Sequence, residues 1–116
     1  MTVVLDAGRI EQLRQLADDD LSEILTETAR DLNRLIGVAG AAVAGADFNA
    51  AFQAAHSGSN LALIVGADEL VAAFRTLASS ALSRNRVRAK KAVAEVGAVW
   101  PATQLAIERL PLEDTR

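Results

Sequence analysis

The sequence predicts an all-α fold: an antiparallel up-down four-helix bundle with a short extra helix at its N-terminus. The apolar residues are mostly Ala, Leu and Val, and only 3% of the residues are aromatic. β-Branched residues never alternate with polar ones, as they would in a half-buried strand. Because 116 residues are about the length of one domain, we expect a single helical domain spanning residues 1–116.

Two helices are expected in the first part of the chain. A short helix covers about Ala7 to Leu16, and the acidic run Asp18–Asp20 is expected to cap a long second helix that ends near Gly45. Apolar or small residues recur along this second helix every three or four positions, which is typical of an amphipathic helix. These positions are Leu21, Ile24, Leu25, Thr28, Leu32, Leu35, Ala39 and Ala42.

The third helix is expected to begin after Asp47 and to end at Gly66. The Asp47 side chain can accept hydrogen bonds from the unpaired amides of the first turn, and Gly66 can adopt the left-handed conformation common at helix ends. Asp68 is expected to cap the fourth helix, which buries residues that include Leu70 and Phe74. Short connections between such helices predict antiparallel neighbours.

A turn at residues 83–86 is expected to lead into the last helix, which Pro111 should end. Pro101 lies within its apolar pattern, and because proline has no amide hydrogen it should kink this helix or divide it in two. The basic residues Arg84, Arg86, Arg88, Lys90 and Lys91 cluster around this turn. They form either a solvated face or a surface for an acidic partner. Arg84, near a helix C-terminus, has a favourable local electrostatic environment that Lys90 and Lys91 lack.

The composition excludes several classes of protein. The chain has no cysteine, so it has no disulfide and no thiolate metal site, which fits a reducing compartment. Its N-terminus lacks the basic start and apolar stretch of a signal peptide, and no uncharged apolar segment is long enough to span a bilayer. We therefore expect a cytoplasmic protein with no membrane partner. A net charge of −3 argues against nucleic acid as a partner.

His56 is the only histidine, and helical spacing places it on the polar side of the third helix. Its face also carries Asn49, Phe52, Gln53, Ser59, Asn60 and Leu63, whereas the opposite face carries Phe48, Ala51, Ala55, Gly58, Ala62 and Val65. His56 is therefore expected to point at solvent, where a neutral imidazole can act as nucleophile, base or metal ligand. A metal site is not expected, because no second histidine or cysteine stands at ligand spacing.

The order of these features resembles that of the histidine-containing phosphotransfer (HPt) domain. The resemblance covers nearly the whole chain: Leu5-Asp6 with a short helix, Asp18-Asp19-Asp20 with a long helix, Gly45-Ala46-Asp47 leading to Ala54-Ala55-His56, and Gly66-Ala67 followed by Leu70 and Leu77. It implies a four-helix bundle that displays one histidine to solvent. That histidine accepts a phosphoryl group from the aspartate of a receiver domain and passes it to another.

The chain departs from the family pattern just after His56. Gly58 stands where the family has Leu, Ser59 where it has Lys, Asn60 where it has Gly, and Leu61-Ala62 replace a pair of small residues. The family's lysine places positive charge near the phosphoryl oxygens, which Ser59 cannot do. A basic replacement could come from a neighbouring helix, where the available candidates are Arg30, Arg34 and Arg75, and the sequence does not place any of them.

The resemblance implies a phosphorelay intermediate with His56 as phosphoacceptor. Its partner is the receiver domain of a hybrid sensor kinase or of a response regulator. Phe52 and Leu63 would form the apolar part of the docking surface, with Gln53, Ser59 and Asn60 as its polar rim. Mg²⁺ belongs to the receiver, so the chain itself needs no cofactor. It has no ATP-site signature, so it is expected to be a carrier, monomeric as most family members are, and not an enzyme.

Two alternatives remain at this point. The protein could be a degenerate HPt-like adaptor that binds a kinase or receiver domain without phosphotransfer. Phe52 and Leu63 could also belong to the rim of the core if the third helix is rotated slightly about its axis.

Overall fold

The computed structural model describes residues 5–114, with side chains for residues 5–17 and 19–110. Every regular element in this range is helical and no strand occurs in it, which confirms the all-α prediction. In order, the elements are α1 (Ala7–Ala17), a short 3₁₀ helix η1 (Asp18–Asp20), α2 (Leu21–Ala44), α3 (Phe48–Ile64), α4 (Asp68–Leu82) and α5 (Arg86–Asp114).

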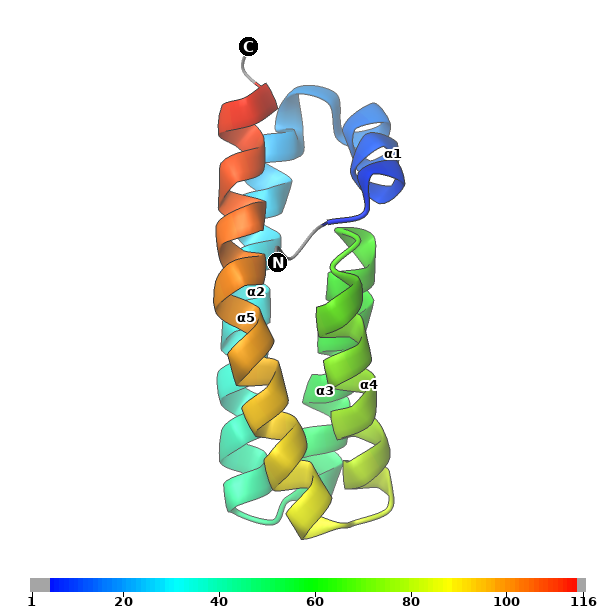
Figure 1. Ribbon diagram of the computed structural model, residues 1–116, viewed down its shortest axis with the longest axis vertical. Helices are drawn as coiled ribbons and strands as arrows, with labels where there is room; N and C mark the ends of the chain where they lie inside the picture. Colours follow the sequence, from blue (N-terminus) through cyan, green and yellow to red (C-terminus); the bar gives the residue numbers. More distant parts are fainter. Residues whose placement is uncertain (1–4, 115–116) are drawn as a thin grey trace.

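The four long helices lie along the length of a molecule that measures 47 × 27 × 19 Å. Figure 1 shows α2 beside α5 in one half and α3 beside α4 in the other. Contacts also join α2 to α3 and α4 to α5, so each long helix packs against two others. In the described part of the chain, no helix combines the length and the apolar character needed to cross a bilayer.

Small and branched aliphatic side chains fill the space between the helices. The largest fully buried side chain is Phe74 of α4, followed by several leucines. Alanines are buried wherever two helices approach closely, above all along α3, where Ala51, Ala55 and Ala62 are completely inaccessible. The alanine-rich composition therefore permits close helix packing around a core that has few aromatic residues.

The helix α3 ends at Ile64, and Gly66 forms the turn that follows it, in the left-handed conformation expected from the sequence. Gly66 has a φ of 70°, its amide donates to the Leu63 carbonyl over 3.1 Å, and the Ala67 amide donates to the Ala62 carbonyl over 2.9 Å. This pair of bonds defines a Schellman turn. The Asp6 amide also donates to the Gly66 carbonyl over 2.8 Å, which ties the segment before α1 to this turn (Figure 1).

The helix α2 ends at Ala44, next to Gly45, as the sequence predicts. Gly45 keeps a negative φ of −89°, and Ala46 adopts the left-handed conformation with a φ of 58°. The Asp47 amide then donates to the Ala42 carbonyl over 2.8 Å. The left-handed position of this turn therefore falls one residue after the glycine.

Of the three predicted caps, Asp47 is confirmed, Asp20 stands at the N-cap position of α2 without a side-chain bond, and Asp68 is wrong. An Asp47 carboxylate oxygen accepts a hydrogen bond from the Ala50 amide over 3.1 Å at the start of α3. Asp68 is instead the first residue of α4, and Asp20, although it stands before α2, makes no side-chain capping bond. Both carboxylates still lie near a helix N-terminus, where negative charge is favourable without a direct bond.

The helix α5 is longer than the sequence predicts. It begins at Arg86, continues as one helix through Pro101, and runs past Pro111 to Asp114. The prediction that Pro111 ends it is wrong. A proline has a φ close to that of a helix and removes one hydrogen bond, so packing against neighbouring helices can outweigh its cost.

Candidate functional site

His56 is exposed near the middle of α3, as the helical spacing predicts. The ring of Phe52, one turn earlier, stacks against the imidazole with a centroid distance of 5.8 Å and an interplanar angle of 12°. Phe52 is itself half-buried and packs against the core. The two rings are therefore nearly parallel neighbours along α3.

The other residues predicted around His56 separate into two groups. Gln53 and Asn60 are exposed, as expected for a polar rim. Leu63, like Phe52, is half-buried and packs against the core. Both apolar residues therefore sit at the rim of the core, the alternative position left open above, and each still presents part of its surface to solvent.

Ser59 does not lie on the exposed rim, which corrects the expectation from the helical wheel. It is only 8% exposed, and its hydroxyl donates to the carbonyl oxygen of His56 over 2.8 Å. On the wheel Ser59 stands at the boundary between the polar and apolar faces, and the packing of α3 against its neighbours covers it. Its hydroxyl is thus used within α3.

Gly58 lies on the buried side of α3, against Phe74 of α4. A Cβ atom added at Gly58 would lie 2.5–2.8 Å from three carbons of the Phe74 ring. The space that the family's leucine would fill is therefore occupied by an aromatic side chain from the next helix. Reasoning from the sequence missed this pair, because nothing in the spacing along the chain indicates which side chain faces Gly58.

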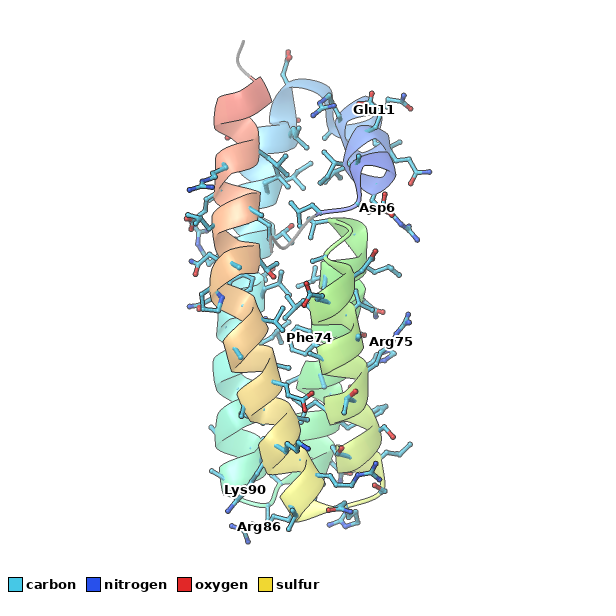
Figure 2. All side chains as sticks on the ribbon, in the orientation of Figure 1. Asp6, Glu11, Phe74, Arg75, Arg86 and Lys90 are labelled. Carbon is cyan, nitrogen blue, oxygen red and sulfur yellow. The ribbon has the colours of Figure 1, made fainter. Side chains whose placement is uncertain are left out.

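The three arginines considered as a replacement for the family's lysine have different surroundings. Arg30 and Arg34 are exposed on α2, where Arg30 pairs with Glu27 at 2.7 Å and Arg34 approaches Asp31 at 4.0 Å. Arg75 is exposed on α4. Figure 2 shows it midway along this helix, with its side chain directed away from α2 and α5.

The basic cluster lies at the end of the molecule opposite α1, where Figure 2 shows Arg86 and Lys90. Two of its members make contacts within the fold. The guanidinium carbon of Arg84 lies 5.3 Å from the ring centroid of Phe48, and Arg86 donates to the Ala44 carbonyl over 3.4 Å at the end of α2. These two cations therefore stabilise the chain reversals at this end.

Among the described residues, His56 belongs to no metal-binding group, and the groove between α2 and α5 does not include it. Among the described residues, no group of three or more His, Cys, Asp or Glu side chains could hold a metal ion. A groove of about 450 Å³ runs between α2 and α5 and does not reach α3. Its lining residues are Ser22, Leu25, Thr26, Ala29, Arg30, Asn33, Gln104, Ile107 and Glu108.

Comparison of the chain with known protein families, with curated proteins and with solved structures finds no match. The assignment of a function therefore depends on the chemistry of the residues themselves.

Proposed function

We propose that this protein is a phosphorelay carrier that accepts a phosphoryl group on His56 from the aspartate of a receiver domain and passes it to another response regulator. The observation that carries the proposal is the exposed imidazole of His56, stacked on Phe52 on the outer face of a helix. In this proposal the four long helices form the antiparallel up-down bundle of the HPt family, and the protein acts as a cytoplasmic monomer.

The transfer needs only a nucleophile from this chain. An unprotonated ring nitrogen of His56 attacks the phosphorus of the aspartyl phosphate in line, so that an N–P bond forms as the O–P bond breaks. The leaving aspartate takes the electron pair of the broken bond and regains its carboxylate charge. The second ring nitrogen keeps its hydrogen, so no general base is required. The receiver supplies Mg²⁺.

The surface around His56 suits transient docking of another protein. Phe52 and Leu63 offer partly exposed apolar area, and the exposed Gln53 and Asn60 can form hydrogen bonds at its edge. Docking over this surface would exclude water from the imidazole, which limits hydrolysis of the group in transit.

The proposal is tested by incubating the protein with a panel of phosphorylated receiver domains and measuring phosphate that is acid-labile and base-stable on the chain. We expect label on the wild-type protein and none on His56→Gln, which retains the helix but lacks the nucleophile. Equal labelling of the two proteins would show that the phosphate is carried elsewhere, and no labelling from any receiver would refute the carrier function.

A second candidate is the adaptor that binds a kinase or receiver domain without transfer. The observation in its favour is that Ser59 replaces the family's lysine and is buried, so α3 supplies no cation one turn after His56. For an adaptor, Phe52→Arg or Leu63→Arg should abolish binding while His56→Gln leaves binding and activity unchanged. A carrier should instead lose its activity with His56→Gln and keep its receiver affinity.

A further inference from the structure

We propose that Arg75 supplies the cation that binds the phosphoryl group on His56, so that α4 provides what the family's lysine provides from the histidine's own helix. This inference rests on the proposed function. It is carried by two geometric observations, which fix the level of Arg75 along α4 and the direction of its side chain.

The contact between Gly58 and Phe74 determines the position of Arg75 along the bundle relative to His56. The chain reverses direction between α3 and α4 through the turn at residues 65–67, so the two helices run in opposite directions side by side (Figure 1). Gly58 lies against the Phe74 ring. In antiparallel helices, the residue after Phe74 on α4 lies opposite the residue before Gly58 on α3. Arg75 is therefore placed beside Ser57, at the level of His56 along the bundle.

The helices that neighbour α4 determine the direction in which the Arg75 side chain points. Ala73 and Thr76 line a shallow groove together with Val99 of α5, so this edge of α4 faces α5. Helical spacing places Arg75 on the other side of the exposed face, toward α3. Figure 2 shows the Arg75 side chain extending away from α5 in agreement with this placement.

His56 lies on the edge of α3 that faces α4. This edge begins at Phe48, whose ring is covered by Arg84 just after the end of α4. Phe52 follows one turn later and His56 another turn later, stacked on Phe52. The imidazole and the Arg75 side chain are therefore exposed side by side, on adjacent helices and on the same face of the molecule.

Arg75 suits this role better than the other two candidates. Arg30 and Arg34 lie on α2, and each has a carboxylate partner one turn earlier on its own helix. A guanidinium carries several N–H donors in a planar fork and can bind two phosphoryl oxygens at once. Arg75 would stabilise the charge on the transferring group and on phosphohistidine, and it neither gives nor takes a proton.

The test compares wild type, Arg75→Gln and Arg75→Lys, with Arg34→Gln as a control that also removes one exposed arginine. Two phosphodonors are used: a phosphorylated receiver domain, and phosphoramidate, a small donor that needs no docking surface. We expect Arg75→Gln to slow labelling of His56 from both donors by about 10- to 100-fold, because loss of one donor costs about 10²–10³-fold in a water-excluded site and solvent weakens the interaction of an exposed one. Arg75→Lys should restore part of the rate, and Arg34→Gln should match wild type.

The outcomes separate this inference from the function on which it rests. Transfer from a receiver with equal rates for wild type and Arg75→Gln overturns the role of Arg75 and leaves the carrier function intact. A slower rate from the receiver alone, with phosphoramidate unaffected, makes Arg75 a docking residue and also overturns the inference. If no receiver transfers to His56, the carrier function is refuted, and the phosphoramidate rates still decide whether Arg75 serves the phosphorylated imidazole.

Discussion

The two faces of α3 are built under opposite constraints. The inner face is made of small residues, with Ala51, Ala55 and Ala62 completely inaccessible and Gly58 against the Phe74 ring. The outer face carries the half-buried ring of Phe52 and the exposed side chains of His56 and Asn60. On the inner face, packing against the neighbouring helix limits the size of the side chains. On the outer face the side chains are not limited in this way, so they can take part in chemistry.

This difference explains how the sequence can depart from the HPt pattern beside the histidine. Three of the departures, Gly58, Ser59 and Ala62, fall on the buried side, and the first two have a packing or hydrogen-bonding reason within this fold. Asn60 is exposed and lies on the outer face. The buried departures therefore reflect how α3 meets its neighbours, and they leave the surface around His56 available.

The largest expected effect comes from placing the family's leucine on the inner face. Gly58→Leu adds a side chain where even a Cβ atom would lie 2.5 Å from the Phe74 ring. Because neither helix can move without losing its other contacts, we expect the free energy of unfolding to fall by about 3 kcal/mol or more. Urea unfolding followed by circular dichroism measures this change.

The matched control for that prediction is a glycine in open space. A Cβ atom at Gly97 of α5 would meet nothing within 4 Å. Gly97→Ala should therefore raise the free energy of unfolding by about 0.5–1 kcal/mol through helix propensity alone. If Gly58→Leu leaves the free energy of unfolding unchanged or raises it, the close contact at Gly58 does not constrain the fold.

The second prediction extends the comparison to the two ends of α3. Gly66 has a positive φ, and a Cβ atom there would lie 2.6 Å from the Asp6 Cβ, so Gly66→Ala should lower the free energy of unfolding by about 2 kcal/mol. Ala46 has a similar φ before the start of α3. Ala46→Gly should raise stability by about 1 kcal/mol, because it relieves the left-handed strain.

Thermal and urea unfolding of Gly66→Ala and Ala46→Gly show whether each substitution lowers or raises the free energy of unfolding. The comparison fails if Ala46→Gly destabilises the protein, since the left-handed turn would then cost less than the entropy that glycine adds to the unfolded chain.

The smallest effect on stability is expected on the outer face. His56→Gln removes an exposed ring and its stack with Phe52, so we expect the free energy of unfolding to change by no more than about 0.5 kcal/mol. The same substitution should abolish phosphate uptake. A large loss of stability would show that the histidine is held for packing, and an activity assay on this variant would then no longer isolate its chemistry.

Much of the fold could be predicted from the sequence because it depends on neighbours along the chain. The periodicity of apolar residues located the helices, Asp47 marked the start of α3 through its own side chain, and Gly66 marked its end through a backbone conformation that glycine favours. The wrong predictions of a cap at Asp68 and of a helix end at Pro111 also concern helix ends. Each residue can occupy more than one position near a helix end, and packing determines which one it takes.

The exposure of His56 was determined by the sequence itself, because helical spacing alone assigns it to the polar face of α3. Only the tertiary structure decided that Ser59 is buried and that Phe74 fills the space beside Gly58. These relations join residues of different helices. Their physical origin is the register in which α3 and α4 pack, which no repeat within a single helix specifies.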